Sequence, residues 1–268
     1  MLMSSDSINI SNGETTAVVS PEGGRLASLM IHGHEVLVTE GEKPTRWGSF
    51  PMIPWCGRLP GGVLRHSDTE YQFPLTNALH ANHGQAHLLN WQVDSSELAM
   101  AKLSTRLGAP WVFGGLVRQR FELDDNSLLI EVQIEAEKFA MPVMAGWHPW
   151  FRRQLDEGGE AELRVTPGQR YELDEQMIPT GQLVPVGPQP WNDCFVGLAS
   201  SPAIVWPGAL KLTVESSFDH WVLFTEPTHA LCIEPQSGPP NQLNDDPKLL
   251  SPGQRFNGWM RLTWSISA

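Results

Sequence analysis

The sequence is poor in cysteine, in positive charge and in long apolar runs. Its three cysteines, Cys56, Cys194 and Cys232, are an odd number without a CxxC spacing, which argues against a disulfide framework and a structural zinc site. The net charge is −12 and the 18 Lys and Arg residues form no basic run, so no nucleic-acid surface is expected. No stretch approaches the ~18 apolar residues of a membrane span, and no secretory leader is recognisable. We therefore expect a soluble, cytoplasmic protein that binds a neutral small molecule.

Proline and glycine are abundant instead, with 22 and 24 residues in a chain of 268, which predicts many turns and many short elements. Residues Leu128–Ala136 alternate apolar and polar side chains with a period of two, as a half-buried strand does. No long segment carries a helical apolar stripe. The sequence thus predicts an all-β protein, a large antiparallel β-sandwich formed by a single domain over residues 1–268. The other expected strands are Thr16–Val19, Arg25–Ile31, Leu98–Ser104, Leu116–Leu123, Ala161–Thr166, Leu210–Glu215, Trp221–Thr225, Ala230–Glu234 and Trp259–Ile266.

The segment HWVLFTEPTHALCIE contains two apolar runs separated by a Pro-Thr-His turn. It predicts a β-hairpin that carries Glu234 to the far end of its second strand. In that strand Ala230, Cys232 and Glu234 share one face. Pro235 follows the carboxylate at once, with two more prolines behind it. Glu234 is either a solvated strand end or a chemical group held in place.

Two other polar groups stand on short segments marked by proline or glycine. Arg58 follows Trp55 and lies between prolines. The five N–H donors of its guanidinium suit vicinal sugar hydroxyls or a carboxylate. The simpler interpretation is a loop arginine paired with an acid. His83 belongs to LHANHGQAHLLNW, together with His80 and His87. This spacing invites a metal interpretation, but no HExxH pattern is present and the Asn-His-Gly step is typical of a turn. We expect a hydrogen-bonding histidine and no metal.

Two further groups lie among aromatic residues. His148 stands between Trp147 and Trp150, whose indoles could stack on the C–H face of a sugar, and proline follows it; a histidine satisfied in the core is the alternative. Asp193 lies in PWNDCF, where it either accepts ligand hydroxyls or caps a turn. Together with Glu234, these groups predict a preformed pocket on loops for a polar ring with apolar faces.

Six segments, in order along the chain, resemble the aldose 1-epimerase (galactose mutarotase) family. They are SPEGGRLASLMIHGHEVLV, PMIPWCGRLPGG, NHG, GWHPWF, NDCF and CIEPQSGPPN. The resemblance implies a galactose mutarotase-like β-sandwich and a free monosaccharide as substrate, without a cofactor. Position by position, it implies that Glu234 is the general base, that His148 is the general acid, and that Arg58, His83 and Asp193 hold the sugar. A monomer or a homodimer is expected.

The chain departs from the family pattern at three positions that bear on the choice of sugar. Gly57 stands where the family usually has Asn, Trp150 replaces the usual Tyr and Arg152 replaces the usual Asn. A hexose-phosphate mutarotase is one alternative, with Arg152 and Arg153 as the only adjacent arginines for a phosphate. A glycosidase would need a second acid near Glu234. A non-catalytic sugar-binding protein is the third alternative, and a cysteine nucleophile has no recognisable signature.

Overall fold

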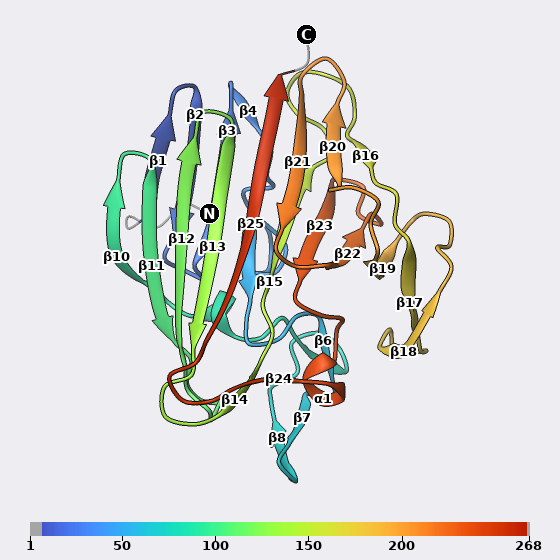
Figure 1. Ribbon diagram of the computed structural model, residues 1–268. Helices are drawn as coiled ribbons and strands as arrows, with labels where there is room; N and C mark the ends of the chain where they lie inside the picture. Colours follow the sequence, from blue (N-terminus) through green and yellow to red (C-terminus); the bar gives the residue numbers. More distant parts are fainter. Residues whose placement is uncertain (1–6, 267–268) are drawn as a thin grey trace.

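The computed structural model describes residues 7–266, and two large antiparallel sheets lie face to face in it (Figure 1). The 11-stranded sheet has, in spatial order, β1 (Ile8–Asn12), β2 (Thr15–Ser20), β3 (Arg25–Ile31), β5 (Ser49–Met52), β15 (Gly146–Arg152), β23 (Ala230–Gln236), β22 (His220–Phe224), β19 (Asn192–Val196), β17 (Gln169–Leu173) and β18 (Pro179–Val184), with β4 (His34–Glu35) on β3. The 8-stranded sheet has β10 (Gln92–Glu97), β11 (Met100–Arg106), β12 (Leu116–Asp124), β13 (Ser127–Glu135), β25 (Arg255–Ile266), β21 (Leu210–Ser216), β20 (Ala203–Trp206) and β16 (Glu162–Arg164).

Three two-stranded ribbons and two short helical turns complete the described chain. The ribbons are β6 (Arg58–Pro60) with β9 (His80–Asn82), β7 (Val63–His66) with β8 (Thr69–Gln72), and β14 (Met141–Val143) with β24 (Lys248–Leu250). The turns are the 3-10 helix η1 (Ala86–Leu88) and α1 (Gln242–Asp245). Across residues 7–266, neither turn has the length or the apolar character that crossing a bilayer with a helix requires.

The alternation of side chains explains how the two sheets share one core. In β12 every second residue, from Val117 to Leu123, is buried between the sheets, and the residues between them face outward. Strand β13 repeats the pattern, so each strand places one row against the 11-stranded sheet, and Gln119 is the one polar residue in the row of β12. The predicted all-β sandwich is confirmed, and its expected strands coincide with observed ones to within a few residues at each end.

The predicted hairpin is also confirmed. Strands β22 and β23 are antiparallel, with Val222 opposite Glu234, and the residues between them form the turn. The expectation that Glu234 ends its strand is wrong, because β23 continues to Gln236. All seven residues of β23 are buried, since one face of the strand meets the second sheet and the other is covered by the segments that surround a cleft.

The expectation that the candidate groups stand on loops is wrong for three of them. Arg58 lies in β6, His148 in β15 and Asp193 in β19. The sequence did not predict β15 as a strand, because proline lacks a backbone N–H and is rarely found in a central strand. Strand β15 nevertheless contains Pro149 and lies between β5 and β23. Its register with β23 pairs Gly146 with Gln236 and resumes at Trp150 with Cys232, leaving Pro149 in the open stretch between them.

A buried amide connects the two sheets behind the strand that carries His148. Gln119, on β12, is 2% exposed; its side chain donates to the carbonyl of Gly24 at 2.7 Å and accepts from the indole N–H of Trp147 at 3.2 Å. Both partners lie on the 11-stranded side of the core, Gly24 directly before β3 and Trp147 in β15. Each bond satisfies a buried polar group that would otherwise lose its hydration.

We expect Gln119→Leu to lower the free energy of unfolding by about 1–3 kcal/mol for each partner that it leaves unsatisfied. Urea unfolding followed by circular dichroism measures the change. Gln133→Leu is the matched control, because Gln133 lies on the outer side of the neighbouring β13 and contacts Asn257 there. The control is expected to stay within about 0.5 kcal/mol of the wild type. Equal losses in the two variants would contradict a bridging role for Gln119.

Candidate active site

One cross-strand row of the 11-stranded sheet forms the floor of the candidate site. Because the pairs on either side of it fix the register between β15 and β23, Glu234 lies opposite His148. On the β5 side His148 is paired with Phe50, and beyond Glu234 the row continues through Val222 to Cys194. Side chains directly across neighbouring strands point to the same face. The fold therefore brings together residues from five separate strands.

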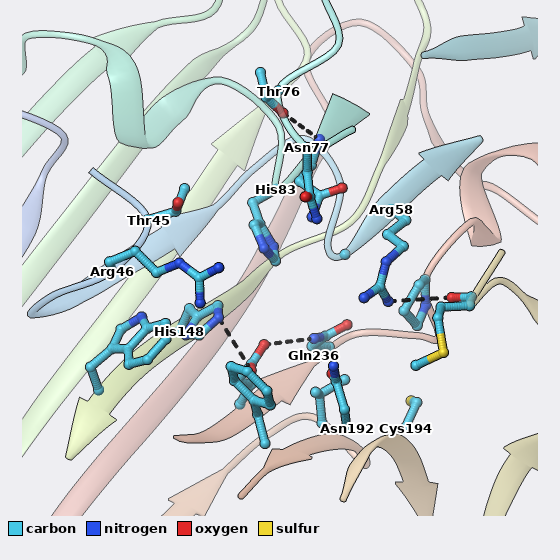
Figure 2. A pocket seen from close by; sticks show the side chains of 18 of the residues that line it. Thr45, Arg46, Arg58, Thr76, Asn77, His83, His148, Asn192, Cys194 and Gln236 are labelled. Atoms are coloured by element: carbon cyan, nitrogen blue, oxygen red, sulfur yellow. Dashed lines mark hydrogen bonds and ion pairs between the residues drawn. The ribbon is translucent and has the colours of Figure 1, made fainter. Parts of the chain in front are cut away.

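Four members of this row, His148, Glu234, Val222 and Cys194, line a cleft with a free volume of about 170 Å³ (Figure 2). Besides the sheet, its walls come from the β6–β9 ribbon, the segment before β5, the segment around Met177 and the one after β23. Its lining residues are Lys43, Thr45, Arg46, Gly57, Arg58, Thr76, Asn77, Asn82, His83, His148, Trp150, Leu173, Met177, Asn192, Cys194, Val222, Phe224, Glu234, Gln236 and Pro240. Polar side chains that can exchange hydrogen bonds with a hydroxylated ligand predominate on the walls.

A buried carboxyl group and a buried imidazole meet on this floor. His148 Nε2 lies 3.3 Å from Glu234 Oε1, and the two side chains are 7% and 3% exposed. The amide of Gln236 donates to the other carboxyl oxygen, Oε2, at 3.4 Å. Burial raises the pKa of Glu234 well above its usual value because it disfavours the charged form, while the nearby Arg58 acts in the opposite direction.

Aromatic rings hold the imidazole of His148 in place. It stacks on Phe50, with ring centres 4.9 Å apart, and on Trp150 at 5.2 Å with an interplanar angle of 7°. The edge of His83 meets it at 5.2 Å. Its Nδ1 is buried and has no hydrogen-bond partner among the described residues. Burial, and then the positive charge of Arg46, lowers the pKa of His148 to about 3.

These two directions both favour uncharged forms in the unliganded pair. Burial favours the neutral carboxylic acid on Glu234 and the neutral imidazole on His148. The pair then holds one mobile proton at a contact of 3.3 Å. Moving that proton across the contact converts the neutral pair into a carboxylate and an imidazolium. Such a pair can accept a proton at one end and release one at the other.

The β6–β9 ribbon supplies Arg58 and His83. Arg58 pairs with Asn82 in this ribbon, and its guanidinium donates to the carbonyl of Met177 at 3.3 Å. His83 follows Asn82 in a left-handed conformation, with φ of 63°. Gly84 then turns the chain so tightly that an added Cβ would lie 2.0 Å from a backbone oxygen of Ile53. This turn holds His83 at the cleft, where burial lowers its pKa well below the usual value.

Gly57, one of the three departures from the family pattern, lies against the segment after β23. Its φ of +62° is left-handed, and an added Cβ would lie 2.7 Å from the ring of Pro240. Pro240 therefore occupies the space that a side chain at position 57 would take. Both residues line the cleft, so this contact forms part of its wall.

Two of the residues that the sequence suggested are not brought to the cleft. Asp193 is paired with Leu223, one residue out of phase with the floor row, and its carboxylate forms an ion pair with Arg170 at 3.2 Å. Trp147 is out of phase in the same way; it is 1% exposed, bonds Gln119 in the core and stacks on the ring of Phe218. Because side chains in a strand alternate between faces, neither residue can share the face of His148 and Glu234. Asp193 and Trp147 therefore do not line the candidate site.

Several lining residues were not identified from the sequence. Asn192 is the neighbour of Asp193 with the correct strand parity, and Gln236 is two residues beyond Glu234 on the same face. Strand periodicity could have found both, had β19 and the full length of β23 been recognised. Lys43 and Arg46 carry no such signal, since they lie in a segment outside any strand between β4 and β5.

The three thiols are poor nucleophiles, and one of them, Cys232, lies close to His148 and Glu234. All three cysteines are buried, and burial raises the pKa of each thiol, so none is a ready thiolate nucleophile. Donor atoms of His148, Cys232 and Glu234 lie within 4.8 Å of one another and could in principle hold a metal ion. A metal ion at this place would have to displace the protons that burial favours on the Cys232 thiol and the Glu234 carboxyl.

Comparisons with known proteins relate the chain to one protein family. Residues 6–263 match the family described as aldose 1-epimerase. YihR of Escherichia coli strain K12, an uncharacterized protein, is 26% identical over 191 residues, which are 67% of this chain and 61% of YihR. The chain therefore aligns with less than two thirds of that relative's length.

Two solved structures show the same fold. A galactose mutarotase-like protein from Clostridium acetobutylicum superposes with a TM-score of 0.87 at 18% identity, covering 97% of this chain and 95% of the other. The GalM/aldose epimerase homologue from C. elegans gives a TM-score of 0.83 at 17% identity, covering 98% and 99%. The similarity in fold extends over nearly the whole chain, as does the family match. The chain belongs to the aldose 1-epimerase family.

Proposed function

We propose that the protein is a mutarotase, which interconverts the α and β anomers of a free aldose by opening and closing the sugar ring. The observation that carries this proposal is the 3.3 Å contact between the buried Glu234 carboxyl and the buried His148 imidazole. A cleft lined by hydrogen-bonding side chains opens directly above this contact. Membership of the aldose 1-epimerase family supports the same reaction class.

The reaction needs one proton acceptor and one proton donor. A base removes the proton from the hydroxyl on C1 while an acid delivers a proton to the ring oxygen O5, and the C1–O5 bond breaks. The aldehyde rotates about C1–C2, and closure on its other face reverses both transfers. Each positioned group typically contributes about 10²–10⁴-fold to the rate. We assign the acceptor to Glu234 and the donor to His148.

One proton, shared by Glu234 and His148, is enough for both proton transfers of this reaction. A sugar in the cleft brings hydroxyl groups to the carboxyl, which favours its ionised form, and the shared proton then resides on His148. Ring opening moves that proton to O5 and moves the O1 proton to Glu234. The open-chain aldehyde thus faces a neutral acid and a neutral imidazole, the state that burial favours. Ring closure restores the charged pair without a proton from solvent.

The cleft walls supply the remaining requirement, which is to hold the sugar while C1 rotates. Arg58 and His83 enter from the ribbon, and Asn82, Asn192 and Gln236 present amides from the strands. Gripping the ring at its other hydroxyls keeps the intermediate in register for closure. The edge of Trp150 borders the cleft, while its indole stacks on His148.

The geometry gives no support to a glycosidase. That reaction uses two carboxyl groups on either side of the scissile bond, roughly 5–10 Å apart. Among the described residues that line the cleft, Glu234 is the only acid. Asp193, the expected second acid, faces away and pairs with Arg170.

Removing either member of the pair tests the proposal. We expect Glu234→Gln and His148→Gln each to lower kcat by about 10²-fold or more, because each removes one proton-transfer group. The rate is measured by NMR exchange spectroscopy on equilibrated glucose and galactose, or by polarimetry on the freshly dissolved α-anomers.

Glu215→Gln makes the same chemical change on β21 of the other sheet and should leave the rate unchanged. Circular dichroism confirms that all three variants are folded. A wild-type protein that binds these sugars but speeds none of them above buffer would instead be a sugar-binding protein without catalysis.

Burial of Glu234 also predicts how stability depends on pH. Its folded-state pKa lies above the unfolded value of about 4.3, so between these values the folded state binds more protons than the unfolded state. The contribution of Glu234 to wild-type stability should therefore fall as the pH rises through this range, whereas the buried histidines, whose pKa values are lowered, contribute equally to wild type and variant. Glu234→Gln removes the carboxyl and with it this loss, so the variant should gain stability relative to wild type between pH 5 and pH 8. Urea unfolding at both pH values measures the difference, which would stay constant if Glu234 were a solvated carboxylate.

Two adjacent residues of β19 provide a test of which face binds the sugar. We expect Asn192→Ala to raise KM severalfold, because its amide lines the cleft. Asp193→Asn should leave KM and kcat unchanged, because its carboxylate faces Arg170 on the other side of the strand. Steady-state kinetics over a range of sugar concentrations distinguishes the two. The reverse pattern would mean that Asp193, and not Asn192, contacts the sugar.

A further inference from the structure

The cleft carries a charge opposite to that of the chain. The protein has a formal net charge of −12, yet the lining of the cleft contains three cations, Lys43, Arg46 and Arg58, and the one carboxyl of Glu234. None of the three cations forms a salt bridge with a carboxylate among residues 7–266. A local excess of positive charge attracts and orients an anionic ligand. A neutral aldose can contact Arg58 through its hydroxyls, but it supplies no charge for Lys43 and Arg46 to pair with.

Two of the cations lie on one tight turn at the mouth of the cleft. The backbone N–H of Arg46 donates to the carbonyl of Lys43 at 3.0 Å, which closes the turn, and Thr45 between them also lines the cleft. The side chains of Lys43 and Arg46 are exposed. This turn therefore presents an ammonium, a hydroxyl and a guanidinium together, a donor set that suits an oxyanion.

The turn lies on the His148 side of the cleft. The guanidinium carbon of Arg46 is 5.5 Å from the ring centre of Trp150, and Trp150 stacks on His148. Figure 2 shows the Arg46 guanidinium directed toward His148, with Arg58 on the opposite side of the cleft. The positive charge of Arg46 acts on His148, and that of Arg58 acts on Glu234. Each end of the proton-transfer pair thus has its own cation.

The connectivity of a pyranose shows which carbon would meet the turn. The ring oxygen O5 is bonded to C1 and to C5, and C5 carries C6. If His148 donates its proton to O5, the substituent on C6 lies on the same side of the cleft as His148. The cation beside His148 is then the one placed to contact that substituent, whereas Arg58 lies on the side of O1.

We propose that the substrate is an aldose with an anionic group on C6, held by Lys43, Thr45 and Arg46. The group is a tetrahedral oxyanion (phosphate, sulfate or sulfonate) or a carboxylate. This inference rests on the proposed mutarotase function and specifies its substrate class. It differs from the hexose-phosphate alternative considered from the sequence, in which adjacent arginines at 152 and 153 bind the phosphate.

That pair of arginines is not available for the role. Arg153 donates to the carbonyls of Thr225 and Pro227, and the guanidinium of Arg152 lies 4.0 Å from Asp156. Neither residue lines the cleft. The proposed anion subsite therefore lies on the turn before β5 and not on β15. No sequence motif indicated this turn.

The test compares anomer exchange for charged and neutral sugars. NMR exchange spectroscopy gives kcat/KM for glucose, glucose 6-phosphate, glucose 6-sulfate and glucuronate, with the spontaneous rate subtracted for each. We expect at least one charged sugar to exceed glucose tenfold or more, and its advantage to shrink as sodium chloride is added, because exposed charges are screened. The charged sugar that is preferred identifies the anion. Equal or lower values for every charged sugar would overturn the inference.

Substitutions locate the subsite. The double variant Lys43→Gln/Arg46→Gln should lower the ratio of charged-sugar to glucose kcat/KM by tenfold or more, with the loss mainly in KM. Arg152→Gln is the matched control, because it removes an arginine outside the cleft and should leave the ratio unchanged. A ratio that survives the double variant, or that falls in Arg152→Gln, would place the anion elsewhere and contradict the proposal.

Binding measurements separate this inference from the mutarotase proposal. Calorimetric titration of the Glu234→Gln protein with the preferred charged sugar measures affinity without turnover. Salt-sensitive binding that is lost when Lys43→Gln and Arg46→Gln are added would support the subsite, even if the wild-type protein accelerated no sugar. Acceleration of glucose without any preference for charged sugars would leave the mutarotase proposal standing and overturn the anion subsite alone.

Discussion

The antiparallel register between β15 and β23 places an imidazole directly opposite a carboxyl, and the rest of the site depends on this alignment. A slip of one residue in either strand would turn its side chain to the other face of the sheet. Burying an isolated charge in the core is strongly unfavourable, whereas two adjacent groups that share one proton can remain neutral. The register therefore allows a buried pair that shares one proton to exist within a folded sheet.

Packing, more than hydrogen bonding, positions the imidazole. His148 has a ring neighbour in Phe50 on the adjacent strand and another in Trp150 on its own strand, while its Nδ1 lacks a partner among residues 7–266. Histidines in many acid-base sites are oriented instead by a carboxylate at the second nitrogen. A carboxylate there would favour the imidazolium, whereas burial among aromatic rings lowers the pKa of His148 to about 3. The site thus depends on its ligand to charge the pair.

The sequence predicted the sandwich and the hairpin that carries Glu234, because alternating apolar residues and turn signals are local properties. The prediction failed at β15, where Pro149 interrupts the pattern of a central strand. The sequence therefore did not indicate on which face of the sheet His148 and Trp147 lie. The same omission at β19 led to Asp193 in place of its neighbour Asn192. Residues in loops, such as the cationic turn before β5, are brought to the cleft only by tertiary structure and carry no periodic signal.

The contact between Gly57 and Pro240 couples two positions that are far apart in the chain. With 2.7 Å between a Cβ at position 57 and the proline ring, a side chain at position 57 would collide with Pro240. The proline ring at position 240 likewise occupies its place only because position 57 lacks a side chain. The two positions therefore act as one unit of the cleft wall. A larger residue at position 57 requires a smaller one, or a displaced segment, at position 240.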